Sequence, residues 1–215
     1  MRVVYFHGFA SSPLSAKGQA LRGLLADVAG DYRIPDLQGD DFTAMTMDSI
    51  LARGEAAAQG DGPLLVIGSS LGGYVAALLA ERRRLPGLIG LVLVAPAFHF
   101  TDRWRERLGE AGVARWQREG SLPFFHHGAE RELLLGVAFY RSCLALPGVP
   151  GEPGVPVAIV HGRADESVDW QGSLAYAQTH AGVELHLVSG DHRLGEPRHE
   201  QLIAWCARDL IGDEG

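Results

Sequence analysis

The stretch "GSSLGGY", residues 68–74, follows directly on the apolar run "PLLVI", residues 63–67. Two adjacent serines lie among three glycines there. Because glycine loses more backbone entropy on folding than any other residue, such a cluster needs a geometric reason. A strand, a G-x-S-x-G turn and a helix form a nucleophile elbow, which lifts a serine hydroxyl above the edge of a sheet.

Only one of the two serines fits the elbow. Gly68 and Gly72 lie two residues before and two residues after Ser70, and "YVAALLAERR" supplies the helix that must follow. Ser69 does not fit, because Ile67 would fall where the strand needs a small residue. We therefore predict that Ser70 is a nucleophile. Taken alone, the motif also suits an ordinary Gly/Ser turn at the end of a strand.

Short apolar runs alternate with longer amphipathic ones on both sides of this motif. The runs are almost continuously hydrophobic, as strands buried on both faces of a parallel sheet are. The alternation predicts βαβ units in an α/β fold. We expect strands at 3–6, 32–34, 64–68, 88–95, 157–161 and 184–188, and helices at roughly 15–29, 43–58, 71–84, 168–180 and 198–211.

One segment interrupts this alternation after the fourth predicted strand. Residues 98 to about 147 offer no strand candidate but contain the helix-like stretches "WRERLGEAGVARWQREG" and "AERELLLGVAFYRSCLAL". The Pro/Gly-rich "LPGVPGEPGVP", residues 146–156, then returns the chain to the sheet. We expect a single domain, 1–215, with a helical, lid-like insertion at about 98–150.

Composition narrows the class of protein. The chain has 215 residues, 47% hydrophobic and 21% charged, and its net charge of -7 is not gathered into blocks. A basic face for nucleic acid is absent, and no apolar run is long enough to span a membrane. Two distant cysteines predict neither a disulfide framework nor a zinc site. With no signal-peptide pattern, we expect a cytoplasmic protein.

A serine nucleophile needs a base and an orienting carboxylate. In the elbow fold these follow the serine in the order acid, then histidine. "VAIVHGRADESV" places Asp165 after one predicted strand, and "ELHLVSGDHRL" places His192 after the next. Since ligands of open α/β sheets bind at the carboxyl ends of the strands, we predict Asp165 as the acid and His192 as the base.

Other acids and histidines are weaker candidates. Asp169 is expected to begin a helix, and Asp191 adjoins His192 on a turn, where neighbouring side chains diverge. His7 is expected to brace its loop, and His161 to be packed or half-exposed at a strand end. The remaining competitors lack the order, spacing or context of the site: Asp36, Asp40, Asp41, Glu166, His99, His126, His127, His180, His186 and His199.

Attack on a carbonyl creates an oxyanion, which requires preorganised N–H donors. The residue after the nucleophile, Leu71, supplies one donor. The loop after the first strand supplies the other, and in "HGFASSP" the natural donor is the N–H of Phe9, with Gly8 allowing the turn. We therefore predict an oxyanion hole formed by Phe9 and Leu71.

Four segments together resemble the α/β-hydrolase superfamily: "YFHGFASSPLSAKG", "GSSLGGY", "HGRADESV" and "GDHRL". Within it they are similar to small bacterial YqiA-like esterases and to the mitochondrial α/β-hydrolase-domain acyl-protein thioesterases. The resemblance implies a compact, mostly parallel six-stranded sheet flanked by helices, ordered 4-3-5-6-7-8 in family strand labels. We expect the antiparallel hairpin that opens many members to be absent.

From these features we expect an enzyme that hydrolyses carboxylic esters or thioesters of small or acyl-chain substrates through a Ser-His-Asp acyl-enzyme. We expect it to need no metal or cofactor, and to have neither nucleic acid nor membrane as a partner. The same triad also serves C–C hydrolysis, amide hydrolysis and acyl transfer, and a non-catalytic ligand-binding protein on this fold is the alternative from another class. Aromatic residues of the insertion either line an acyl pocket or pack the insertion onto its own core; the pocket candidates are Trp104, Trp116, Phe124, Phe125, Phe139 and Tyr140.

Overall fold

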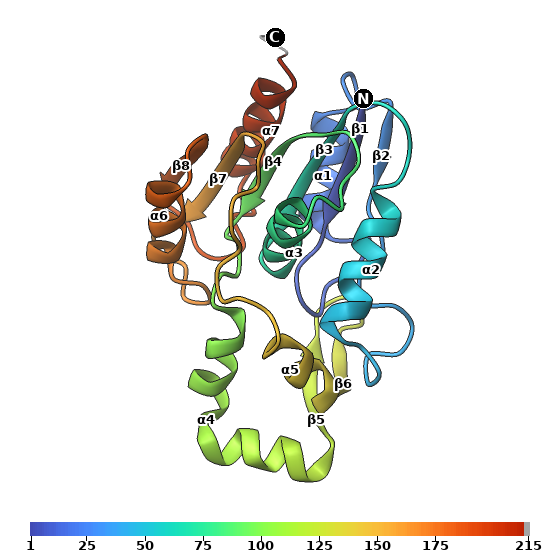
Figure 1. The fold of residues 1–215 in the computed structure, drawn as a ribbon, viewed down its shortest axis with the longest axis vertical. Helices are drawn as coiled ribbons and strands as arrows, with labels where there is room; N and C mark the ends of the chain where they lie inside the picture. Colours follow the sequence, from blue (N-terminus) through green and yellow to red (C-terminus); the bar gives the residue numbers. More distant parts are fainter. Residues whose placement is uncertain (213–215) are drawn as a thin grey trace.

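The computed structural model describes residues 1–212. Six parallel strands form the central sheet in the order β2-β1-β3-β4-β7-β8, which is the expected order. The strands run side by side with their carboxyl ends at one edge (Figure 1). Their bounds are β1 Arg2–Phe6, β2 Asp31–Arg33, β3 Leu64–Ser69, β4 Leu88–Val94, β7 Val157–Gly162 and β8 Val183–Val188.

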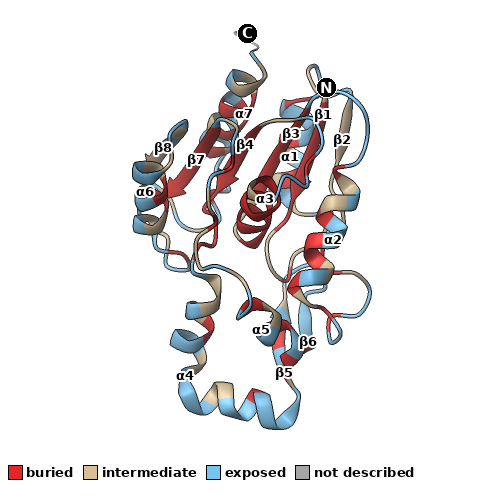
Figure 2. Cartoon of the chain, viewed as in Figure 1, coloured by how far each residue is buried: buried red, intermediate tan, exposed pale blue. Residues whose placement is uncertain are grey.

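Alternate residues of the central strands belong to two separate cores, because successive side chains of a strand point to opposite faces. In β1, Val4 and Phe6 pack into one core, while Val3 and Tyr5 pack into the other. Figure 2 shows the middle strands buried along almost their whole length. Burial on both faces explains why the sequence of these strands is continuously apolar.

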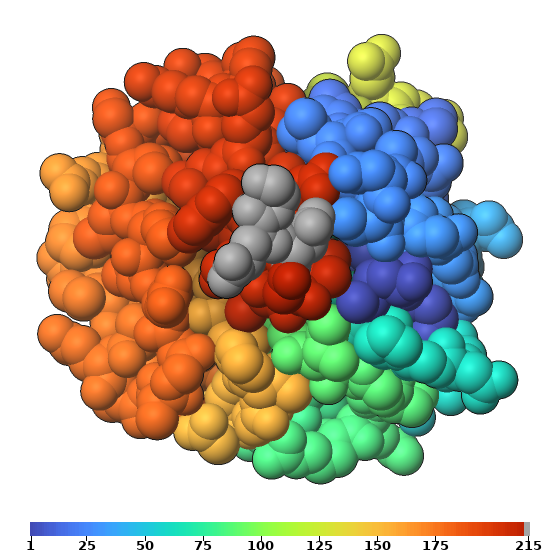
Figure 3. Space-filling view, turned by 90° about the horizontal axis from the view of Figure 1, so that it is seen from above, coloured from blue at the N-terminus to red at the C-terminus, as the bar shows by residue number. Residues whose placement is uncertain are grey.

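Two layers of helices cover the sheet. Helices α1 (Ala16–Leu24) and α7 (Pro197–Ile211) pack beside each other on one face, and Figure 3 shows blue N-terminal residues against red C-terminal ones. Arg208 of α7 forms an ion pair with Asp27, which follows α1. Helices α2 (Met47–Ala57), α3 (Leu71–Glu81) and α6 (Trp170–Thr179) cover the other face. None of the helices within residues 1–212 has the length and apolarity that crossing a bilayer requires.

The insertion follows β4 as expected, but it is not wholly helical. It consists of α4 (Phe100–Glu119), the antiparallel hairpin of β5 (Ser121–His126) and β6 (Arg131–Gly136), and α5 (Val137–Cys143). The prediction that residues 98–147 contain no strand is therefore wrong. The hairpin buries Leu122 and Phe124 on one face, opposite Leu135 and Leu133, so cross-strand packing overrides the helix propensity of the Glu- and Leu-rich sequence.

The insertion lies beyond the carboxyl ends of the strands (Figure 1), where it contacts two loops of the main body. The N–H of Gly128 in the hairpin turn donates to the carbonyl of Ala10 (3.1 Å) in the loop after β1. The hydroxyl of Thr43, in the loop before α2, donates to the carbonyl of Leu134 in β6 (2.9 Å). The hairpin is thereby attached directly to the loop that carries Phe9.

Candidate active site

Ser70 lies at the sharp turn between β3 and α3. Its backbone has φ 53° and ψ −116°, a left-handed conformation that a residue with a side chain rarely adopts, and its N–H donates to the carbonyl of Val94 (2.9 Å). The two glycines of the motif are required by space. A Cβ on Gly68 would lie 2.5 Å from the carbonyl oxygen of Gly72, and a Cβ on Gly72 would lie 2.1 Å from that of Phe6. The turn is strained and closely packed, as a nucleophile elbow is.

Two loops bring His192 and Asp165, the predicted base and acid, to Ser70. His192 follows β8 and Asp165 follows β7, and these strands are neighbours in the sheet. Nε2 of His192 lies 3.1 Å from Oγ of Ser70, and Nδ1 of His192 lies 2.8 Å from Oδ2 of Asp165. Both distances are those of hydrogen bonds, so the three side chains form one continuous hydrogen-bonded series.

The carboxylate of Asp165 is buried and fully hydrogen-bonded. Its Oδ1 accepts the N–H groups of Ser167 (2.8 Å) and Val168 (2.7 Å), while its Oδ2 accepts from His192 and from Nε2 of His161 (3.1 Å). Burial raises the pKa of Asp165, but the hydrogen bonds from His161 and His192 outweigh it and hold the pKa well below its usual range. Asp165 is therefore an anion at neutral pH.

The competing acids have other structural roles. Asp169 caps α6 as predicted, its side chain accepting the N–H of Gln171 (3.0 Å). Asp191 accepts the N–H groups of the turn that follows it, and Asp36 does the same within the loop after β2. Glu166 is exposed. None of these four acids is among the hydrogen-bond partners of His192 in residues 1–212.

The two expected oxyanion donors have free N–H groups. Leu71 is the first residue of α3, where an N–H has no partner within the helix, and Phe9 lies in the loop after β1. Within the described chain, neither N–H donates to a protein acceptor. A Cβ on Gly8 would lie 3.4 Å from Cβ of Ser70, so the loop passes close to the nucleophile.

Two buried side chains fix the loop that carries Phe9. Gln38 accepts the N–H of Ala10 (3.0 Å) and donates to the carbonyl of Ser11 (2.8 Å), and Ala10 has a positive φ of 54°. His7 braces the loop as expected, because Nδ1 lies 2.9 Å from the carbonyl oxygen of Gly8 and Nε2 accepts the N–H of Leu37 (3.2 Å). The contacts of Gln38 were not foreseen, since nothing in the sequence links residue 38 to residue 10.

His161 is the second residue that sequence reasoning missed. It was expected to be packed or half-exposed at a strand end; it is fully buried there, and it also hydrogen-bonds Asp165. The available signal was the "HGRAD" segment, which places a histidine at the end of a strand and an acid four residues later on a tight loop. His199 is also buried, and its Nε2 donates to the carbonyl of Ser189 (2.9 Å).

The aromatic residues of the insertion occupy different environments. Trp104 is buried and contacts the ring of Phe9 edge to face, with ring centroids 5.5 Å apart. Trp116 and Tyr140 lie inside the insertion, where the indole of Trp116 donates to the carbonyl of Leu135 (2.9 Å). Phe124 packs on Trp104, and Phe125 is exposed on the outer face of the hairpin. Phe139 is also buried, and its ring stacks on that of Phe9 with centroids 5.5 Å apart, so Trp104 and Phe139 are the two of the six candidates whose rings are in contact with Phe9 in the described residues.

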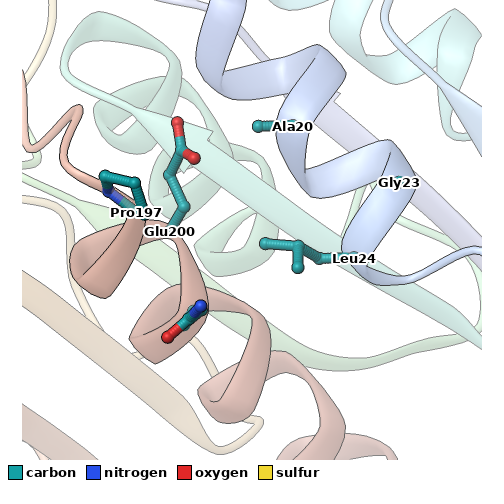
Figure 4. A pocket seen from close by; sticks show the side chains of 6 residues that line it. Ala20, Gly23, Leu24, Pro197 and Glu200 are labelled. Carbon is teal, nitrogen blue, oxygen red and sulfur yellow. The ribbon is translucent and has the colours of Figure 1, made fainter.

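A groove of about 300 Å³ lies elsewhere, between α1 and α7 (Figure 4). None of Ser70, Asp165 and His192 lines it. In residues 1–212 no three histidine, cysteine or acidic side chains come together as a metal-binding group. The residues that line the groove are Ala20, Gly23, Leu24, Pro197, Glu200 and Gln201.

Solved structures of hydrolases share this fold. A hydrolase from Agrobacterium vitis superimposes with a TM-score of 0.82 at 24% identity, covering 98% of this chain and 87% of its own. Mouse alpha/beta hydrolase domain-containing protein 10 gives 0.80 at 21% identity, with 99% and 90% covered. The esterase Est1E of Butyrivibrio proteoclasticus, solved with ferulic acid, gives 0.74 at 18% identity, with 99% and 88% covered. The fold of the chain is the α/β-hydrolase fold.

Curated relatives and a family model agree with the fold. The mitochondrial palmitoyl-protein thioesterase ABHD10 of Mus musculus is 30% identical over 168 residues, and that of Homo sapiens is 25% identical over the same length. These matches cover 70% of this chain, which spans about half the length of the relatives, 52% and 51% respectively. The model of the uncharacterised protein family UPF0227 matches residues 2–205, so the chain belongs to this family.

Proposed function

We propose that the protein is a serine hydrolase that cleaves carboxylic esters or thioesters through an acyl-enzyme. One observation carries the proposal: Ser70, His192 and Asp165 form a hydrogen-bonded series beside two N–H groups without protein acceptors. A nucleophile, a base, an orienting acid and an oxyanion site are the parts that acyl transfer needs. The esterase and thioesterase names among the similar proteins support the same class of reaction.

In the proposed reaction, Nε2 of His192 takes the proton of Ser70 while Oγ attacks the carbonyl carbon. The N–H groups of Phe9 and Leu71 stabilise the oxyanion that forms. The protonated His192 then gives its proton to the departing alcohol or thiol, which leaves Ser70 acylated. Water, deprotonated by His192, attacks the ester of Ser70 and releases the acid. Asp165 stays ionised throughout and stabilises the imidazolium.

Aromatic rings around Phe9 support an apolar acyl group as the substrate's reacting part. Phe42, Phe100, Trp104 and Phe139 all pack against the ring of Phe9, with centroids 5.5–6.3 Å apart. The ring of Phe9 is itself partly exposed. An acyl group bound at Ser70 would therefore meet aromatic side chains close to the oxyanion donors.

Labelling with a fluorophosphonate, which phosphonylates activated serines, tests the proposal. The wild-type protein should be labelled at Ser70 and should hydrolyse p-nitrophenyl esters. Ser70→Ala should lose both properties, since removing one member of such a triad costs on the order of 10⁴ in rate or more.

Ser69→Ala is the matched control, because it changes the adjacent serine of the same motif. It should keep labelling and turnover within about tenfold of the wild type. Labelling that survives in Ser70→Ala and disappears in Ser69→Ala would move the nucleophile to Ser69. An unlabelled, inactive wild-type protein would favour a ligand-binding role instead.

A further inference from the structure

A second histidine lies behind the acid of the proposed triad. His161 is the penultimate residue of β7 and has no exposed surface. Its Nε2 lies 3.1 Å from Oδ2 of Asp165 and 3.2 Å from the carbonyl oxygen of Val168. Its Nδ1 lies 2.8 Å from Oγ of Ser173, a buried residue of α6. The hydrogen-bonded series that begins at Ser70 therefore continues through Asp165 into the layer between β7 and α6.

The acceptors around His161 define its tautomer. A carboxylate and a carbonyl both face Nε2, and neither can donate, so Nε2 carries the proton. In the neutral imidazole Nδ1 is then an acceptor, and the hydroxyl of Ser173 donates to it. Ser173 thus holds His161 in the tautomer that donates to Asp165.

His161 and His192 share a single oxygen. Both donate to Oδ2 of Asp165, while Oδ1 is taken up by the N–H groups of Ser167 and Val168. The bond from His161 limits rotation of the carboxylate. It also withdraws part of the negative charge that Oδ2 presents to His192, and that charge is what stabilises a protonated His192.

We propose that His161, oriented by Ser173, is a positioning residue that holds Asp165 toward His192 and sets the pH at which His192 can act as a base. The inference rests on the proposed function and adds two residues to it. His161 touches no reacting atom and acts only through Asp165.

Other charged groups near the site also influence the pH profile, and their contribution must be distinguished from that of His161. Lys17 of α1 interacts electrostatically with Asp165, with Asp191 and with Glu200 of α7. Burial lowers the pKa of Lys17 to about 8, so its titration falls on the alkaline side of a pH profile. The acid limb is therefore the limb to measure, with Lys17, Asp191 and Glu200 unchanged in every variant.

The experiment compares His161→Leu, His161→Gln and Ser173→Ala with the wild type in the pH dependence of kcat/KM for p-nitrophenyl acetate and of fluorophosphonate labelling. In His161→Leu the full charge of Asp165 faces His192, so the midpoint of the acid limb should move to higher pH by about half a unit to one unit. At neutral pH kcat should fall about 10- to 100-fold, with KM changed less than about threefold, because the base is less well placed.

The other two variants separate positioning from packing. The glutamine side chain retains an N–H donor near Oδ2, so His161→Gln should bring the midpoint back toward that of the wild type. Ser173→Ala removes the group that orients His161 and should shift the midpoint in the same direction as His161→Leu, by a smaller amount. Ser173→Ala also carries the test if His161→Leu does not fold.

Midpoints that stay within about 0.2 pH units of the wild type in His161→Leu and in Ser173→Ala, while activity falls in parallel with the melting temperature, would show that His161 only fills space and would overturn the inference. This outcome differs from failure of the proposed function, in which the wild-type protein itself would not be labelled at Ser70.

Discussion

Gly72 shows at the scale of one residue why the elbow sequence is so restricted. Its Cα faces β1, and a side chain there would meet the carbonyl oxygens of Phe6 at 2.1 Å and of His7 at 2.7 Å. Both are backbone atoms at the end of β1, which cannot rotate away as a flexible side chain can. Any Cβ at this position must therefore push α3 away from β1, and with it the N–H of Leu71.

We predict that Gly72→Ala reduces the free energy of unfolding by about 2 kcal/mol, which in a chain of this size lowers the melting temperature by roughly 4–8 °C. The rate of fluorophosphonate labelling of the folded fraction should drop about 100-fold, since Ser70 and Leu71 move together. Thermal unfolding and timed labelling measure the two effects.

Gly23→Ala is the matched control, because a Cβ on Gly23 in α1 would have no atom within 4 Å. It should leave labelling unchanged and should raise stability by about 0.5–1 kcal/mol, the usual advantage of alanine in a helix. A Gly72→Ala variant as stable and as reactive as Gly23→Ala would mean that α3 can shift without disturbing the turn.

The proposed triad could be predicted residue by residue, because each member lies in a short local pattern. Ser70 is flanked by glycines at fixed spacing, and Asp165 and His192 each follow an apolar strand. His161 and Gln38 could not be assigned in this way. Their roles depend on contacts across the fold, and a histidine at a strand end or a glutamine in a loop has many ordinary structural uses.

At the scale of elements, the six strands of the main sheet lie within about one or two residues of their predicted bounds. In the inner strands β1, β3, β4 and β7, burial on both faces makes the sequences almost uniformly apolar. The hairpin of β5 and β6 was missed for the opposite reason. β5 buries only the alternate residues Leu122 and Phe124, β6 is mostly exposed, and the pairing partners lie across a turn rather than at helical spacing. The carboxyl edge of the sheet thus carries an element that local propensity does not indicate.

The loop after β1 depends on a contact between elements, and Gln38 provides its principal polar support. We predict that Gln38→Met, which keeps the volume but removes both hydrogen bonds, lowers kcat about 10- to 100-fold with little change in KM, since the N–H of Phe9 loses its fixed position. The N–H of Ala10 would remain buried without a partner, which costs about 1–3 kcal/mol of stability. Steady-state kinetics and thermal unfolding measure these changes.

Gln59→Met makes the same substitution at an exposed residue whose side chain only donates to the carbonyl of Glu55. It should keep kcat within about twofold of the wild type, as most surface changes do. If Gln38→Met lost stability but kept full turnover, the bond from Gly128 to Ala10 would have to be sufficient to hold the loop, and the hairpin rather than Gln38 would be its main support.

At the scale of the whole molecule, His7 couples the buried centre to solution pH. It is 1% exposed, and the N–H of Leu37 points at its Nε2, so the folded protein accommodates a neutral imidazole. Burial lowers the pKa of His7. The carboxylate of Asp36, 4.0 Å from Nε2 of His7, raises that pKa, but by less than burial lowers it. Burial also lowers the pKa of His126 on the hairpin, although this residue is partly exposed.

The sign of the pH dependence follows from the direction of these shifts. An unfolded histidine binds its proton near pH 6.5, whereas His7 in the folded protein binds it only at lower pH. Above about pH 6.5 neither state binds this proton, and His7 does not reduce the stability of the folded protein. As the pH falls below that value, the unfolded state binds the proton more readily and the folded protein loses stability. The pKa of Asp165 is also lowered, but an unfolded aspartate titrates near pH 3.9, so its contribution is lost only in stronger acid.

We therefore predict that the melting temperature falls between pH 7.5 and pH 5, and that His7→Gln reduces this fall. A tenfold difference in proton affinity is worth about 1.4 kcal/mol, or roughly 3–5 °C in a chain of this length. Glutamine can accept the N–H of Leu37 without titrating, so the variant should be less stable than the wild type at pH 7.5 yet lose less stability on acidification.

His127→Gln, at an exposed position of the hairpin turn, is the control and should show the wild-type dependence of melting temperature on pH. Equal slopes in all three proteins would mean that the charged form of His7 is accommodated, either by rotation of the ring toward Asp36 or by opening of the loop that carries Phe9.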